Sequence, residues 1–411
     1  MVVPFSDKTQ HEAKAFERTK QSFCLPDGII YLDGNSLGPL PKGVSERVAT
    51  AVEEEWGGKL IRAWNEADWI DLPTRVGNRI GAMIGAEPNA VVVADSTSIN
   101  LQKALAAALQ LRPERKVILS DSGNFPTDLY MAQGLIAALG DGHKLKVVSP
   151  DEVEDALDDS VAALMLTEVD YRTGRLHSMK ALTAAAHAVG ALTIWDLAHS
   201  AGALPVDLAG CKADFAVGCG YKYLNGGPGA PAFIYGRPDL VDRIKPLQSG
   251  WMGHEAPFAF ELDYSPAAGA DRMRVGTPPI LSLTALDAAL DVWDGIEIDT
   301  VRAASIGLAD LLIDEIERRC AGFGLRLASP REGDRRGSQV SFHFDEGYAA
   351  IQALQAQGVI GDFRAPDLMR FGITPLYIGE AEIIAAVAGL ETVLKDRLWD
   401  QPNLKTRAKV T

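Results

Sequence analysis

Cysteine is scarce in this chain, and long apolar runs are missing. The four cysteines show neither the paired spacing of a metal site nor the density of a disulfide framework; they are Cys24, Cys211, Cys219 and Cys320. No stretch approaches the roughly 18 uninterrupted apolar residues of a membrane-spanning helix, and the first residues, MVVPFSDK, lack a signal-peptide core. We therefore expect a cytoplasmic protein in a reducing compartment, with no metal site and no membrane span.

Positive charge is also in short supply. The 40 lysines and arginines are outnumbered by 55 aspartates and glutamates, which gives a formal net charge of -15. Such a chain repels a phosphate backbone, so we expect no nucleic-acid partner. No internal repeat or coiled-coil heptad is present, whereas 47% hydrophobic residues over 411 positions suffice for two folded domains.

Short apolar runs alternate with amphipathic segments through most of the chain. We predict strands at 29–33, 90–94, 116–119, 144–148, 162–166, 192–195, 215–217 and 232–235, with helices between most of them. This alternation predicts an α/β fold whose mainly parallel sheet is covered by helices on both faces. A polar helix is expected before about residue 30.

The composition changes after about Pro278. From there we predict a long helix over about 280–320, a strand over 337–344 and further helices, which form a smaller C-terminal α/β domain. The predicted organisation is an N-terminal segment (1–45), a large ligand-binding domain (46–280) and a small domain (281–411). Ligands of such sheets bind at the carboxyl ends of the strands. The residues that end or follow predicted strands there are Asp95, Asp121, Thr167, Asp196 and Cys219.

Asp196 and Lys222 follow two of these strands, 26 residues apart. An aspartate at a strand end often caps the next helix, and a lysine in a loop is often only solvated. In combination with His199 and the Gly-Gly-Pro-Gly loop after Lys222, however, they match the needs of pyridoxal phosphate. That cofactor requires a carboxylate that keeps its ring nitrogen protonated and a lysine that forms a Schiff base. The sequence therefore favours a pyridoxal phosphate enzyme.

Two loops could hold the rest of such a cofactor. Thr97 and Ser98 follow a strand and open a helix, where backbone N–H groups and hydroxyls bind phosphate, although an ordinary helix cap has the same sequence. The loop that contains Phe125, Thr127 and Asp128 also opens a helix. Phe125 could stack on the flat ring, with local packing as the alternative. His199 is expected in the first helical turn after Asp196, close to the ring or only supporting it.

Several strings of this chain resemble the kynureninase family, which are fold-type-I pyridoxal phosphate enzymes related to class V aminotransferases. The string YKYLNGGPG, from Tyr221 to Gly229, is the most specific of them. The resemblance covers nearly the whole chain and runs through residues 31–39, 125–128, 170–174, 195–202, 220–229, 249–254, 276–280 and 369–377.

The resemblance implies hydrolysis of L-kynurenine to anthranilate and L-alanine in tryptophan degradation, with 3-hydroxykynurenine as a second substrate and a link to NAD biosynthesis. It implies that Lys222 carries the Schiff base, that Tyr221 exchanges protons, and that Asp196 pairs with the ring nitrogen. Phe125 would stack on the ring beside His199. The phosphate end would be lined by Thr97, Ser98, Asp128 and Tyr221, with Thr127 and Thr167 as further cofactor contacts.

The resemblance also implies a homodimer whose active sites are shared between subunits. Trp251 and Thr277 would reach the cofactor of the partner subunit. Arg370 would form a bidentate contact with the substrate α-carboxylate, and Ser36 and Trp64 would line the pocket for the aryl group.

Other functions of the same fold remain open. A cysteine desulfurase or selenocysteine lyase needs a persulfide cysteine on a flexible loop, whereas Cys320 is predicted inside a helix. An aminotransferase is compatible with the fold, because fold does not determine function. A catalytically silent relative that stores the cofactor is the third alternative.

Overall fold

The computed structural model describes residue 16 and residues 19–408. The N-terminal helix predicted before residue 30 lies mostly outside these residues, and from Gln21 to Ile29 the chain forms turns and loops. The structure divides into two compact units: 44–171 with 177–290, and 1–43 with 172–176 and 291–411. These units differ from the predicted ranges, because the N-terminal segment groups with the C-terminal residues and the second boundary falls at 290/291.

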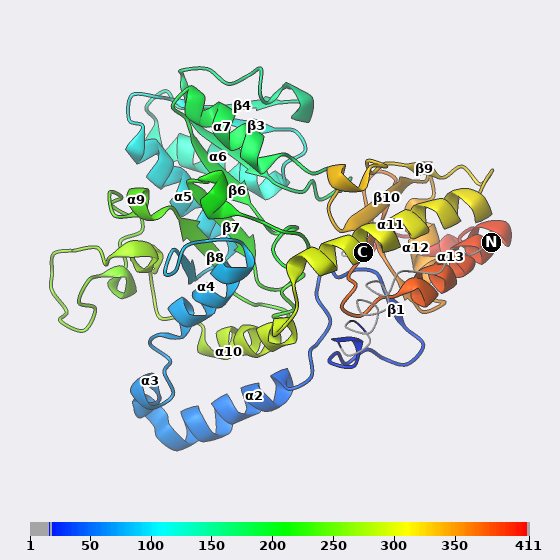
Figure 1. Ribbon diagram of the computed structural model, residues 1–411, viewed down its shortest axis with the longest axis horizontal. Helices are drawn as coiled ribbons and strands as arrows, with labels where there is room; N and C mark the ends of the chain where they lie inside the picture. The colour runs from blue at the N-terminus through cyan, green and yellow to red at the C-terminus, as the bar shows by residue number, and fades with distance from the viewer. Residues whose placement is uncertain (1–15, 17–18, 409–411) are drawn as a thin grey trace. The chain divides into compact units, whose positions relative to one another are not determined.

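The larger unit, residues 44–171 and 177–290, is built around a sheet of seven strands (Figure 1). From one edge to the other the strands are β2 (Val91–Val93), β8 (Ala232–Gly236), β7 (Phe215–Cys219), β6 (Leu192–Asp196), β5 (Val161–Thr167), β3 (Val117–Asp121) and β4 (Lys144–Val148). Neighbours from β7 to β4 are parallel, whereas β8 is antiparallel to both β7 and β2. The predicted α/β fold with a mainly parallel sheet is confirmed.

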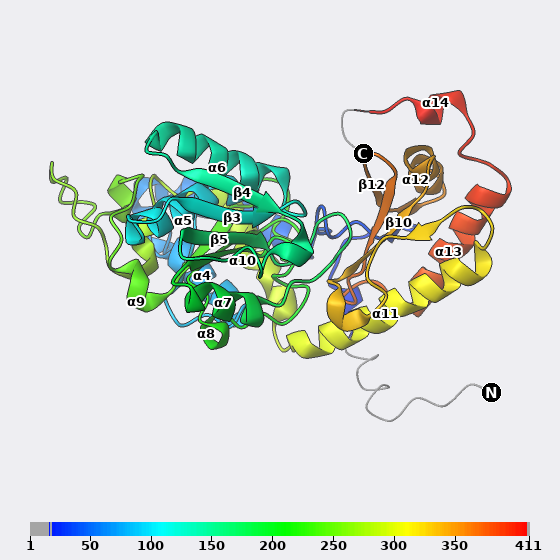
Figure 2. The same ribbon diagram turned by 90° about the horizontal axis from the view of Figure 1, so that it is seen from above.

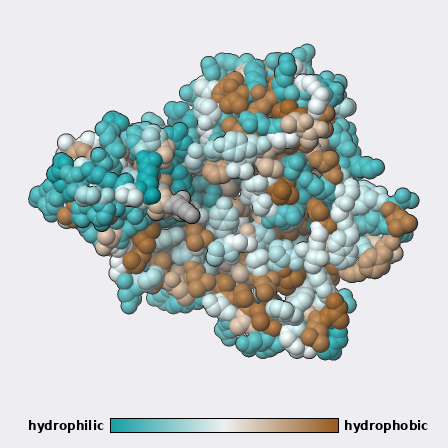
Figure 3. Space-filling model, turned by 180° about the vertical axis from the view of Figure 1, so that it is seen from behind, coloured by the Kyte–Doolittle hydropathy of each residue, from teal (hydrophilic) through white to brown (hydrophobic). Residues whose placement is uncertain are grey.

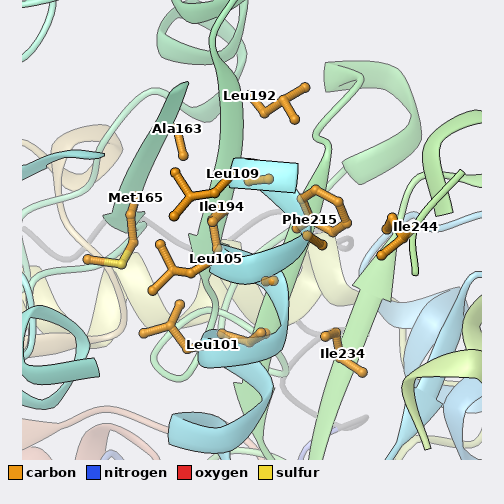
Figure 4. Close-up of a cluster of buried hydrophobic side chains, with 14 of the residues drawn as sticks. Leu101, Leu105, Leu109, Ala163, Met165, Leu192, Ile194, Phe215, Ile234 and Ile244 are labelled. Carbon is orange, nitrogen blue, oxygen red and sulfur yellow. The ribbon is translucent and has the colours of Figure 1, made fainter. Parts of the chain in front are cut away.

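Helices cover both faces of this sheet. Helices α5 (Thr97–Leu111) and α6 (Pro126–Leu139) pack on one face, and α7 (Met179–Ala188) packs on the other (Figure 2). Leu101, Leu105 and Leu109 lie four residues apart, so they share the face of α5 that packs on the strands (Figure 4). They contact a fully buried cluster that includes Met165, Ile194, Phe215 and Ile234. This packing fixes the strand ends from which the site residues project.

The larger unit contains further helices before, between and after the strands of its sheet. They are α2 (Val44–Thr50), a π-helix η1 (Ala51–Lys59), η2 (Leu60–Arg62), α3 (Ala63–Glu66), α4 (Leu72–Met83), η3 (Pro150–Glu152), α8 (Leu208–Cys211), α9 (Pro238–Val241), η4 (Trp251–Gly253), η5 (Gly269–Met273) and α10 (Ile280–Ala289). Glu55 anchors the π-helix: it accepts a hydrogen bond of 2.8 Å from the Trp69 indole and pairs with Arg47 at 2.9 Å.

The smaller unit, residues 1–43, 172–176 and 291–411, contains a four-stranded antiparallel sheet. Its order is β12 (Asp362–Arg364), β13 (Leu368–Gly372), β10 (Gln339–His343) and β9 (Arg326–Leu327). A separate parallel pair joins β1 (Ile30–Tyr31) to β11 (Val359–Ile360). The helical segments are η6 (Leu290–Trp293, which starts in the larger unit), α11 (Ile298–Arg319), η7 (Gly333–Arg335), α12 (Gly347–Gln355), α13 (Glu380–Lys395) and α14 (Pro402–Lys405).

The single helix predicted over 280–320 is wrong. The chain forms α10, η6 and α11 instead, and Gly295 between the last two adopts φ +74°, a left-handed conformation that ends helices.

The surface mixes polar and apolar residues, and one face shows several groups of hydrophobic residues among hydrophilic ones (Figure 3). The most exposed large apolar side chains include Leu60, Ile61, Phe260 and Leu262. Within the part of the chain that the structure describes, no helix has the length and apolar composition needed to cross a membrane.

Candidate active site

A pocket lies in the larger unit, where β5, β6 and β7 end and where α5 and α6 begin. It is lined by Thr97, Ser98, Phe125, Thr127, Asp128, Thr167, Tyr171, Asp196, Ala198, His199, Tyr221 and Lys222. All of the cofactor-binding residues predicted from the sequence are therefore brought together here, except Trp251 and Thr277. Tyr171 and Ala198 were missed by the sequence reasoning.

Lys222 follows β7 and points its amine at a histidine. The distance from Lys222 Nζ to His199 Nε2 is 3.0 Å. His199 is buried but does not lie in a helix as predicted, because residues 198–203 form turns after β6. The amine therefore has a nitrogen partner that can accept a hydrogen bond from it.

Asp196, the last residue of β6, is buried and surrounded by hydrogen-bond donors. Its Oδ1 accepts the backbone N–H of Ala198 at 2.8 Å, and the Thr167 hydroxyl also donates to its carboxylate. Burial raises the pKa of Asp196, and the nearby Lys222 ammonium opposes this shift. These contacts orient a carboxylate at the floor of the pocket.

Asp128, in the first turn of α6, places a second carboxyl against Asp196. Burial, reinforced by the Asp196 carboxylate, raises the pKa of Asp128 well above its usual value, and the protonated group donates a hydrogen bond to Asp196. The structure brings the Asp128 carboxyl beside that of Asp196 in the pocket, and its predicted place at the phosphate end stays a prediction. Asp128 Oδ2 is buried, and within the described part of the chain it accepts no hydrogen bond from an N–H donor.

Tyr221 lies beside the lysine and keeps its proton. Burial raises the pKa of its phenol far above the usual range, and its hydroxyl is hydrogen-bonded to the Cys219 thiol. Lys222 Nζ lies 5.8 Å from the centre of the Tyr221 ring. At neutral pH, Tyr221 is therefore a neutral proton donor within the same pocket.

The start of α5 combines a helix cap with hydroxyls that line the pocket. Ser96 is the capping residue, since its Oγ accepts the backbone N–H of Ile99 at 3.4 Å. The ordinary helix cap, which was the alternative to a phosphate site here, is thus present. It is made by Ser96, whereas Thr97 and Ser98 line the pocket. The first N–H groups of a helix lack intrahelical acceptors and favour an anion.

Phe125 is the residue before α6, and 42% of it is exposed. Its ring packs edge-on against Tyr171, with 5.1 Å between ring centres and 87° between planes. Tyr171 lies in one of the strings that carry the family resemblance, which is the signal that could have found it.

Two of the three predicted substrate residues meet in the smaller unit. Arg370 is 1% exposed and forms a bidentate pair with Asp362, with Nε at 2.7 Å from Oδ1 and Nη2 at 2.5 Å from Oδ2. Arg370 Nη2 also donates to Ser36 Oγ at 3.1 Å, and Ser36 donates to Asp362 at 2.9 Å. Arg364 pairs with the same Asp362 at 2.9 Å. Asp362 was missed by the sequence reasoning.

The remaining predicted residues do not line the pocket of the larger unit. The Trp64 ring packs edge-on against Trp69 with 5.9 Å between centres. Trp251 is 41% exposed and stacks on Phe260, and Thr277 is exposed.

Comparisons with known proteins show which family the chain is similar to. The family model of the kynureninase C-terminal domain matches residues 301–390. The chain is 50% identical to a kynureninase of Pseudomonas fluorescens over 95% of each protein. It is 46% identical to a kynureninase of Burkholderia mallei over 98% of this chain and 100% of that protein. The chain belongs to the kynureninase family.

The fold of this kynureninase-family chain also occurs in more distant enzymes. A solved structure of a C-DES mutant, with glycine covalently linked to its pyridoxal phosphate, has a TM-score of 0.78 at 18% identity. It covers 90% of this chain and 98% of the C-DES chain. This likeness shows the fold-type-I architecture.

As a member of the kynureninase family, the chain is a pyridoxal-phosphate-dependent hydrolase that acts on a carbon–carbon bond. The pocket fits this cofactor: it offers a lysine amine, the buried carboxyl pair of Asp196 and Asp128, and the N-terminus of α5. Among the described residues, no group of three histidine, cysteine or acidic side chains is arranged to hold a metal.

Proposed function

We propose that this chain adds water to L-kynurenine and cleaves it to anthranilate and L-alanine, and that it accepts 3-hydroxykynurenine in the same way. The observation that carries the proposal is the meeting of Lys222, Asp196 and Tyr221 in one pocket of a kynureninase-family chain. We further propose a cytoplasmic enzyme of tryptophan degradation that supplies NAD biosynthesis.

Lys222 is proposed to bind the cofactor and then to move protons. When bound, pyridoxal phosphate supplies an electron sink for charge that develops on the substrate. Asp196, which accepts hydrogen bonds from Ala198 and Thr167, is oriented to hold a proton on the ring nitrogen. Asp128 donates to Asp196 and so keeps the negative charge on Asp196. His199, 3.0 Å from Lys222, is positioned to orient the amine.

Tyr221 is proposed as the general acid and base at the ketone oxygen of the substrate. The phenol is protonated at neutral pH, as a proton donor must be. Water addition to the ketone needs a proton at that oxygen, and collapse of the hydrated ketone returns it. General acid–base groups of this kind contribute roughly 10²- to 10⁴-fold to a rate.

Arg370, Ser36 and Trp64 are proposed to bind the two ends of the substrate. Arg370 offers the guanidinium that suits a carboxylate, and its orientation is fixed by Asp362. Trp64, held edge-on by Trp69, offers a rigid aromatic surface for the aryl group.

We propose a homodimer in which Trp251 and Thr277 reach the cofactor of the partner subunit. Support comes from exposure: Trp251, Phe258, Phe260 and Leu262 are apolar, at least 41% exposed and close together in sequence. Exposed apolar groups of this kind mark interaction surfaces.

The test is the absorbance of the purified protein between about 300 and 500 nm during addition of L-kynurenine, with anthranilate read by its fluorescence. A yellow protein that releases anthranilate, with both signals lost in Lys222→Ala, is the expected result. Release must not depend on an added keto acid, which excludes an aminotransferase. A yellow protein that leaves kynurenine intact would contradict the proposal.

Cysteine is the control substrate for the desulfurase alternative. Cys320 is 3% exposed at the end of α11, and burial raises the pKa of its thiol to about 11. A buried thiol with a raised pKa is a poor persulfide carrier, so we expect no sulfide release from cysteine.

A further inference from the structure

Lys103, on α5, is a buried ammonium outside the pocket. Only 4% of the residue is exposed, and burial lowers its pKa while Asp95 opposes that shift. Its Nζ donates to three acceptors: Asp95 Oδ2 at 2.5 Å, the Met273 carbonyl at 2.7 Å and Asn100 Oδ1 at 3.2 Å. An ammonium has three N–H groups, so each one has an acceptor.

The first acceptor, Asp95, belongs to the segment 95–98, in which α5 begins at Thr97. Asp95 adopts φ +48°, a left-handed conformation that is strained for a residue other than glycine. Its carbonyl accepts the N–H of Ala232, and Asn100, which also accepts from Lys103, donates to the Ala94 carbonyl at 2.8 Å. Lys103 therefore stabilises the strained residue Asp95, which precedes Thr97 and Ser98 at the start of α5.

The second acceptor belongs to the segment 273–277, which ends at Thr277. The N–H of Met252 donates to the Val275 carbonyl at 3.3 Å, which ties the turn containing Trp251 to this segment. The two backbones are in close contact, since a Cβ added to Gly250 would lie 2.1 Å from the Val275 oxygen. The positions of Trp251 and Thr277 are thus coupled to that of Met273.

We propose that Lys103 is a positioning residue that holds two cofactor-binding segments in register, the segment 95–98 and the segment 273–277 with Trp251. The proposal rests on the proposed function, which assigns both segments to pyridoxal phosphate. In the proposed homodimer the first segment serves the subunit's own cofactor and the second serves the partner's. One ammonium then supports both sites.

Substitution of a lysine that only stabilises the fold would give a different result from substitution of a lysine that positions the cofactor-binding segments. Loss of a buried charge partner destabilises a protein whether or not the ligand is bound. A positioning residue also lowers ligand affinity and disturbs both segments, because misplacement of binding groups by about 1 Å can cost up to about 10²-fold. The readouts are therefore cofactor affinity and the environment of Trp251, not turnover.

The experiment compares wild type with Lys103→Met and Asp95→Asn. Each full-length apo-protein is titrated with pyridoxal phosphate by absorbance, and its melting temperature is measured with and without the cofactor. Asparagine tolerates the left-handed conformation, so Asp95→Asn removes the charge and keeps the backbone conformation. In parallel, fluorotryptophan labelling reports the Trp251 resonance, assigned with Trp251→Phe.

We expect Lys103→Met to bind pyridoxal phosphate at least about tenfold more weakly, to gain less melting temperature from it, and to shift the Trp251 resonance. Asp95→Asn should weaken binding in the same direction. The matched control is Arg272→Met, which removes a buried cation from η5, the helix that also contains Met273; its partners are Asp242 and the Ile244 carbonyl. It should lower stability while leaving cofactor affinity within about threefold.

Three results would overturn the proposal: unchanged affinity in Lys103→Met, weakened affinity with an unchanged Trp251 resonance, or an equal loss in Arg272→Met. None of these readouts uses kynurenine. A wild type that binds pyridoxal phosphate but releases no anthranilate would remove the proposed reaction and leave Lys103 in its role. A wild type that binds no pyridoxal phosphate would overturn both.

Discussion

The carboxyl of Asp128 donates a hydrogen bond to the carboxyl of Asp196. Two acidic groups this close cannot both ionise readily, so burial leaves the proton on Asp128 and the charge on Asp196. The arrangement places a single negative charge at the end of β6, next to the Lys222 ammonium. A ring nitrogen bound there would meet an oriented carboxylate.

This pair leads to a prediction for Asp128. Asp128→Asn keeps an N–H donor toward Asp196 and should retain kcat within about tenfold, whereas Asp128→Ala removes the donor. A hydrogen bond to a charged group contributes about 1.5–3 kcal/mol, so we expect Asp128→Ala to lose roughly 10- to 150-fold in kcat/KM. The rates of both variants are measured by anthranilate fluorescence at saturating cofactor. Equal activity of the two variants would show that the donor has no role.

Tyr221 gives a second prediction. Tyr221→Phe keeps the ring and removes the hydroxyl, so the proposed proton transfer is lost while packing is kept. We expect kcat to fall by roughly 10²- to 10⁴-fold, with a smaller change in cofactor affinity measured by absorbance titration. Cys219→Ser is the control, because it keeps a hydrogen-bonding partner for the Tyr221 hydroxyl. Near-normal turnover with weak cofactor binding in Tyr221→Phe would assign the hydroxyl to the cofactor alone.

The pocket was largely predictable because its residues end buried strands or begin helices. Asp196 and Thr167 are the last residues of parallel neighbours, so the alternation of apolar runs and polar ends already brought them together. The contact of Asp128 with Asp196 was not predictable, since it depends on how the start of α6 packs beside β6. The turns after β6 also replaced the expected helix around His199 without moving it from the pocket.

The cluster around Arg370 shows a different limit. Asp362 and Arg370 are direct cross-strand partners of β12 and β13. The turn residues between these strands predict a hairpin in principle, but its register, which decides the partner of Arg370, follows from the folded geometry. The contact of Ser36 with Arg370 joins residues more than 300 positions apart and has no local signal.

Asp33 predicts a pH dependence of stability. Burial, together with the nearby Asp362 carboxylate, raises the pKa of Asp33 from 3.8 to about 7. A raised pKa means that the folded chain binds this proton more tightly than the unfolded chain. The contribution of protonated Asp33 to the free energy of unfolding is therefore complete below about pH 4. It is lost as the pH rises through about 7.

The measurement is the free energy of unfolding in urea at pH 5 and pH 8 for wild type and Asp33→Asn. The pKa of Asp362 is lowered, mainly by its hydrogen bond from Arg370 against the effect of burial, so that group stays charged over this range. We expect wild type to lose stability relative to Asp33→Asn between the two pH values. A constant difference would show that Asp33 does not titrate in this range.

The last prediction concerns the two arginines that share Asp362. The buried Arg370 donates hydrogen bonds to Asp362 from Nε and Nη2, and Nη2 also donates to Ser36. The Arg364 side chain, in contrast, is 33% exposed. Lysine keeps the charge but not the planar fork, so Arg370→Lys should raise KM for kynurenine by roughly 10- to 100-fold with a smaller loss of kcat. Arg364→Lys is the matched control and should change KM by less than about threefold, because exposed pairs contribute little. Equal effects of the two substitutions would indicate that the net charge of the cluster, rather than the guanidinium geometry of Arg370, binds the substrate carboxylate.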